Sequence, residues 1–138
     1  MITLYKFLAI VPLFFLMLII YNAMAFFGVD FGVEATAIFY APLPSGAEWA
    51  PTWGDIIIML SVLVLYFEII KSTKTGTASI VEHGLSMVVF IACLMEFMLF
   101  DIAGTSVFLI ITLMSLLDVV AGFNITIASA RRDFTMGG

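Results

Sequence analysis

The chain has 138 residues, of which 64% are hydrophobic and only 11% are charged, and its mean hydropathy is +1.24. Soluble domains carry about 25% charged residues, so this composition excludes a soluble fold. Ten acidic against five basic residues give a formal charge of −5, which excludes binding to a nucleic-acid backbone. We therefore expect one integral membrane domain that comprises residues 1–138 and binds no nucleic acid.

The first predicted membrane span covers residues 6–28. The uncharged run from Phe7 to Val29 is long enough, as a helix, to cross the roughly 30 Å hydrocarbon core. Pro12 lies in the second or third turn of this run. We expect a mild kink there, because a neighbouring helix or side chain can compensate for one lost backbone hydrogen bond.

An outer loop at 29–53 follows the first span. Its apolar run ATAIFY at 35–40 predicts a short strand or an interfacial helix, and the prolines and glycine that follow predict a turn back towards the membrane. Trp49 and Trp53 are expected to anchor the loop at the headgroup level. The acidic residues of the loop lack the ligand spacing of a calcium site, so we expect solvated charges and no metal.

Three further spans are predicted at 54–71, 82–100 and 105–127. The link at 101–104 is short, so the last two spans should form an antiparallel hairpin. The expected fold is therefore an all-α membrane protein, an antiparallel bundle of four transmembrane helices with a structured outer loop between helices 1 and 2.

The charges that flank the spans predict the orientation. All basic residues fall on the side of the two termini: Lys6, Lys71, Lys74, Arg131 and Arg132. The opposite loops contain only acidic charges: Asp30, Glu34, Glu48, Asp55 and Asp101. The positive-inside rule then places both the N- and C-termini in the cytoplasm, and we expect a multi-pass protein of a bacterial inner (plasma) membrane.

Three ionisable residues inside the spans are candidate proton or ion relay sites, because an ionisable group in a membrane usually faces a partner or a cavity. They are Glu68, Glu96 and Asp118. For Glu68, an ion pair with Lys71 at the cytoplasmic interface is the simpler explanation. Glu96 and Asp118 have no cation at matching depth in the chain, so each either carries a proton for packing or handles protons or cations.

Counting 1.5 Å per residue from the outer surface places these acids in two layers. The outer layer, at a depth of roughly 10 Å, contains Glu96, Thr112, Ser61 and Asn22. The inner layer, at a depth of roughly 20 Å, contains Asp118, Glu68 and Tyr66.

One face of the fourth span is expected to pack against other helices. Thr112, Ser115, Asp118 and Gly122 recur at helical spacing, and small or hydroxylated residues let membrane helices approach closely. A shorter stripe of the same kind on the third span, formed by Glu82, Ser86, Cys93 and Glu96, is predicted to face it across the hairpin.

No catalytic motif is present in the sequence, so we expect a protein that is not an enzyme and has no resident cofactor beyond lipid. The single His83 at the start of the third span is read as a solvated or capping residue. The favoured function is a non-enzymatic subunit that packs with other transmembrane subunits, the same or different, in a homo-oligomer or an energy-converting complex. Two alternatives remain open: a small proton- or cation-coupled channel or transporter that uses Glu96 and Asp118, and a quinone- or haem-anchoring subunit built around His83.

Overall fold

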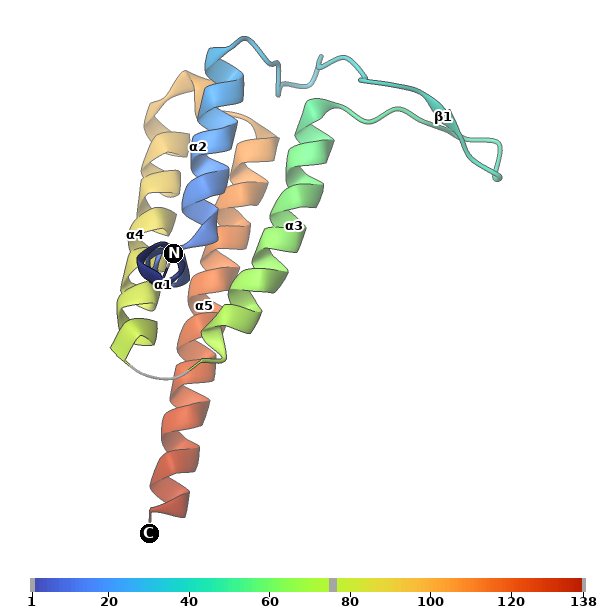
Figure 1. Cartoon of the computed structure of the whole chain (residues 1–138). Coiled ribbons are helices and arrows are strands. Elements are labelled where there is room, and N and C mark those ends of the chain that lie inside the picture. The colour runs from blue at the N-terminus through green and yellow to red at the C-terminus, as the bar shows by residue number, and fades with distance from the viewer. Residues whose placement is uncertain (1, 75–76, 138) are drawn as a thin grey trace.

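A computed structural model of the chain describes residues 2–74 and 77–137. Figure 1 shows a helical bundle from which a long loop projects sideways. The elements in chain order are α1 (Ile2–Ile10), α2 (Leu13–Phe26), β1 (Ala41–Pro42), β2 (Glu48–Trp49), α3 (Trp53–Ser72), α4 (Thr77–Leu99), the 3-10 turn η1 (Asp101–Ala103) and α5 (Ser106–Met136).

Three of the helices, α3, α4 and α5, are long and apolar enough to cross a membrane. They contain 20, 23 and 31 residues, which correspond to lengths of about 30, 35 and 46 Å at 1.5 Å per residue. The predicted spans at 54–71, 82–100 and 105–127 fall on these helices. α5 continues to Met136 and extends beyond the other helices (Figure 1).

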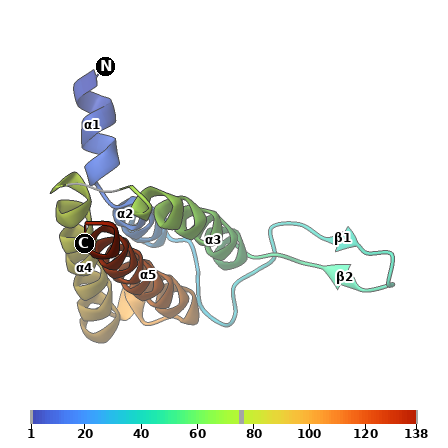
Figure 2. The same ribbon diagram turned by 90° about the horizontal axis from the view of Figure 1, so that it is seen from below.

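The expectation of one mildly kinked helix over residues 6–28 is wrong, because the chain breaks completely at Val11 and Pro12. Pro12 has an extended backbone with a ψ of 132°, and a new helix, α2, begins at Leu13. Figure 1 views α1 end on while the bundle helices run along the page, and Figure 2 shows α1 leaving the bundle to the side. α2 has 14 residues and a length of about 21 Å, which is less than the thickness of a hydrocarbon core.

The start of α3 is fixed by a capping box. The Thr52 hydroxyl accepts a hydrogen bond from the backbone N–H of Asp55, and the Asp55 carboxylate accepts one from the Thr52 N–H at 2.8 Å. Gly54 lies against α5 so closely that a Cβ there would sit 2.7 Å from a methyl group of Val107. The capping box and this close contact fix α3 against α5 where the loop re-enters the bundle.

α4 and α5 form the predicted antiparallel hairpin. Tyr21 of α2 connects the segment between these two helices, which contains η1, to the core. The Tyr21 side chain is fully buried, stacks on Phe31 and contacts Phe108 edge to face. Its hydroxyl donates to the Ile102 carbonyl at 3.1 Å and lies 2.6 Å from the hydroxyl of Thr105, which caps α5. One side chain therefore holds α2, the link and the start of α5 together.

The loop at 29–52, which we call the arm, is extended and contains neither a helix nor a long strand. β1 and β2 are two-residue strands paired in antiparallel register, and they follow the ATAIFY run instead of including it. Hydrogen bonds from Leu43 N to Ala47 O and from Ile38 N to Pro51 O, both 2.8 Å, join the two legs. The prolines of the arm explain the short ladder, since a proline has no N–H to donate.

The buried hydroxyl of Tyr21 generates the first prediction. Tyr21→Phe should lower the stability of the purified protein by about 1 kcal/mol, because it removes the hydrogen bonds that the Tyr21 hydroxyl makes with the Ile102 carbonyl and the Thr105 hydroxyl. Tyr66→Phe is the matched control, because Tyr66 is 60% exposed. Denaturant unfolding in lipid–detergent micelles measures both variants, and equal stabilities would contradict the role assigned to Tyr21.

Candidate functional site

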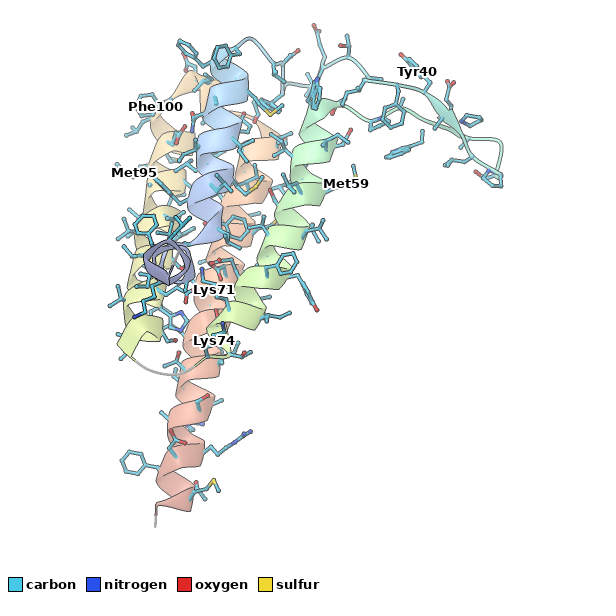
Figure 3. All side chains as sticks on the ribbon, viewed as in Figure 1. Tyr40, Met59, Lys71, Lys74, Met95 and Phe100 are labelled. Atoms are coloured by element: carbon cyan, nitrogen blue, oxygen red, sulfur yellow. The ribbon has the colours of Figure 1, made fainter. Side chains whose placement is uncertain are left out.

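A cluster of ionisable side chains lies inside the bundle, near the end where α3 stops. Its members, called here the charged cluster, are Glu68 and Lys71 of α3, Glu82 and His83 of α4, and Asp118 of α5. The three acids and the histidine are all at most 5% exposed, and the Lys71 side chain is 14% exposed. Figure 3 labels Lys71 and Lys74 at this end, which we call the lysine end, far from Tyr40 on the arm.

Lys71 joins three elements through its ammonium group. Its Nζ atom lies 3.1 Å from Glu68 Oε1 and 3.0 Å from Glu82 Oε1, and it donates a hydrogen bond of 2.9 Å to the Val11 carbonyl. An ammonium group has three hydrogens to donate, and these contacts employ all three. Lys71 therefore connects α3 to α4 and to the chain just before the helix break.

Glu68 completes the other side of the break. Its Oε1 atom accepts a hydrogen bond of 3.0 Å from the backbone N–H of Leu13, the first residue of α2. A carboxylate at a helix N-terminus satisfies a free N–H and interacts favourably with the helix dipole. The ion pair thus caps both broken ends: Lys71 binds the carbonyl of Val11, and Glu68 binds the N–H of Leu13.

This arrangement corrects the simple interpretation of the Glu68–Lys71 pair. The predicted ion pair is present, but Glu68 is 1% exposed and is not at a solvated interface. Non-helical backbone is tolerated at membrane depth only where protein groups satisfy it. The pair supplies those groups at the break next to Pro12.

His83 is also buried, so the prediction of a solvated or capping residue is wrong. Its Nε2 atom lies 3.2 Å from the Ser79 hydroxyl, and its ring lies near Phe123. A Cβ on Gly122 would sit 2.7 Å from the Nδ1 atom of His83. Gly122 therefore makes room for the imidazole ring, and a ring held between Ser79 and Gly122 gives little support to the haem-anchoring hypothesis.

The polar stripes of α4 and α5 face each other along the hairpin. Ser86 lies beside Asp118, and Cys93 lies beside Ser115. The four residues of the predicted packing face, Thr112, Ser115, Asp118 and Gly122, are all buried. The hydroxyls of Thr112 and Ser115 donate to carbonyls of their own helix, at 2.9 and 3.1 Å, which satisfies these donors within α5.

Glu96 lies apart from the charged cluster. It is half-buried and lines a pocket with Asn22, Met95 and Phe100 near the opposite end of α4. Ten residues of helix separate Glu96 from Ser86, the neighbour of Asp118, which is about 15 Å. The structure therefore does not bring Glu96 and Asp118 together as a relay pair.

The predicted layers are present only in part. Asn22 shares its pocket with Glu96, whereas the Ser61 hydroxyl bonds to the carbonyl of Ile57 in its own helix. In the inner layer Glu68 and Asp118 are neighbours, but Tyr66 points outward and is 60% exposed. Trp49 and Trp53, the predicted interfacial anchors, are both exposed. Trp49 belongs to β2 in the outer part of the arm, and Trp53 is the first residue of α3.

Within residues 2–74 and 77–137, no group of three or more histidine, cysteine or acidic side chains could hold a metal ion. Comparison with protein-family models, with curated proteins and with solved structures finds no match for this chain. Function must therefore be argued from the geometry of the bundle.

Sequence reasoning missed two residues that organise this site. Glu82 was assigned only to a polar stripe, although it is the second partner of Lys71. Tyr21 was not identified at all, although it anchors the other end of α2. The available signal was a proline inside an apolar segment together with a lysine and two acids at similar depth, because a broken membrane helix requires polar partners.

Lys71→Met provides the test of the charged cluster. It should lower stability by about 3 to 5 kcal/mol, because it leaves two buried carboxylates without their cation and the Val11 carbonyl without its donor. Lys74→Met removes an exposed cation from the same end and should have little effect. The readout is the unfolding midpoint in detergent, and a similar small effect of both substitutions would show that the cluster does not stabilise the fold.

Gly122→Ala tests the contact between α5 and His83. The added methyl group should displace the His83 ring and reduce stability by about 1 to 3 kcal/mol. Gly84→Ala is the matched control, because a Cβ there meets no atom within 4 Å and alanine favours a helix. Thermal unfolding compares the two variants. The packing assignment fails if Gly122→Ala is as stable as Gly84→Ala.

Proposed function

We propose that this protein is a non-enzymatic integral membrane subunit that assembles laterally with other transmembrane chains. The observation that carries the proposal is the arm, which projects beyond its own bundle (Figures 1 and 2). Val33, Phe39, Tyr40, Leu43 and Trp49 are all exposed on it. Backbone hydrogen bonds nevertheless hold the arm in a defined shape.

The bundle of this chain does not cover the apolar side chains of the arm. Apolar groups held in water cost free energy, and aromatic residues are enriched both at subunit interfaces and at headgroup level. An arm that contacted only its own bundle would bury them there. We infer that the arm lies along the membrane surface and contacts a neighbouring subunit, while the apolar outer faces of α3, α4 and α5 meet lipid or further helices.

The proposed topology has four crossings with both termini in the cytoplasm of a plasma membrane. The lysine end then faces the cytoplasm, as the positive-inside rule requires, and the arm is outside. α2 makes the remaining crossing although it is only about 21 Å long. The break at Pro12 then lies at the cytoplasmic border of the hydrocarbon core, and α1 lies along that interface.

Cysteine labelling tests this topology. In a Cys93→Ser background, a cysteine at Ala47 should react with an impermeant reagent from outside intact cells, whereas one at Met136 should react only after the membrane is opened. Both positions are exposed, so access depends on the side of the membrane. Labelling of both positions from the same side would contradict the topology.

Lateral assembly is tested by the arm itself. The double variant Phe39→Ser and Tyr40→Ser should reduce the mass of the native assembly, measured by light scattering in mild detergent, and should leave the unfolding midpoint unchanged. Phe134→Ser is the control, because Phe134 is 88% exposed at the far end of α5 and away from the arm. A wild-type protein that is monomeric and free of other chains under these conditions would refute the proposal.

A further inference from the structure

Two buried carboxyl groups of the charged cluster face each other. Glu68 is 1% exposed, and its Oε1 atom already accepts hydrogen bonds from Leu13 and Lys71. Its Oε2 atom is buried and has no hydrogen-bond partner among the described residues. The carboxyl group of Asp118, which is 3% exposed, lies beside Glu68. Two ionised carboxylates offer only acceptors to each other, so this contact requires a donor.

The charges that surround the pair lead to the same conclusion. α3 contributes Glu68 and Lys71, α4 contributes Glu82 and His83, and α5 contributes Asp118. The segment between α1 and α2 contributes only backbone groups, the Val11 carbonyl and the Leu13 N–H. With every carboxyl ionised and His83 neutral, three negative charges would oppose the single ammonium of Lys71. Buried charge without compensation is costly in a membrane.

We propose that Glu68 and Asp118 form a binding site for one proton, held between the two carboxyl groups. A hydronium ion of the aqueous phase transfers its proton to a carboxylate oxygen of Asp118 and becomes a water molecule, and the resulting O–H donates to Glu68 Oε2. A repulsive contact between two acceptors becomes a short, charge-assisted hydrogen bond. No covalent bond other than the new O–H bond forms in the protein.

The geometry assigns the proton to Asp118. The Lys71 ammonium and the backbone N–H of Leu13 both donate to Glu68 Oε1, at 3.1 and 3.0 Å. The Ser86 hydroxyl lies beside Asp118. Among the described residues, no cation lies within ion-pair distance of Asp118, whereas Lys71 is 3.1 Å from Glu68. Lys71, with its side chain 14% exposed, is the most exposed member of the cluster.

The site is independent of the proposed assembly, because all its groups belong to one chain. It also differs from a relay between Glu96 and Asp118, since Glu96 lines a separate pocket. The occupied site keeps Glu68 charged and available to cap α2, so proton binding and the helix break share one residue.

Infrared difference spectroscopy of the full chain in lipid nanodiscs tests the proposal, because a protonated carboxyl group has a carbonyl band that an ionised one lacks. The wild-type protein should show such a band at neutral pH and lose it on titration to high pH. Asp118→Asn should remove the band. Glu34→Gln, which changes an exposed acid of the arm, should keep it.

Ser86→Ala is a second test that applies even if Asp118→Asn fails to fold. Loss of the hydroxyl beside Asp118 should shift the carbonyl band to a new frequency. The proposal is overturned if the wild type has no band at neutral pH or if Ser86→Ala leaves the band unmoved. A band removed by Glu96→Gln instead would place the proton on Glu96 and overturn it as well. So would loss of the band when sodium replaces choline at constant pH, which would identify a cation site.

Discussion

The bundle depends on one buried interaction, the contact of the Lys71 ammonium with Glu68, Glu82 and the Val11 carbonyl. A helix that breaks at Pro12 exposes a carbonyl and an N–H that lipid cannot satisfy. Lys71 binds the carbonyl of Val11, and Glu68 binds the N–H of Leu13. Glu82, the second carboxylate that contacts Lys71, attaches α4 to the same point. Without this contact the Val11 carbonyl would lose its donor, and the segment next to α1 would lose this attachment to the bundle.

The two ends of the bundle are held by different chemistry. At the arm end, Tyr21 joins α2 to η1 and α5 through neutral hydrogen bonds and aromatic packing. At the lysine end, ionised groups make the connections, and their number exceeds what the single lysine balances. This imbalance is the basis of the protonation site that we propose at the lysine end, and the exposed side chains of the arm are the basis of the proposed assembly.

The sequence was sufficient to place α3, α4, α5 and their hairpin, because apolar length and polar boundaries are strong constraints in a membrane. It was insufficient for Pro12, since the size of a proline distortion depends on which neighbours replace the lost hydrogen bond. Depth counting correctly matched Glu68 with Asp118 but misplaced Tyr66. Counting residues along a helix gives the depth of a side chain in the membrane but not the face of the helix on which it lies. Residues two apart on a helix, such as Tyr66 and Glu68, point in nearly opposite directions.

The central claim is that the Lys71 contacts set the direction of α1 relative to the bundle. The most direct measurement is the distance between spin labels at Leu4 of α1 and Ile127 of α5, both exposed positions, in a Cys93→Ser background. The account predicts one narrow distance distribution for the native lysine and a broad one when Lys71 is replaced by methionine. The same narrow distribution in both proteins would contradict it.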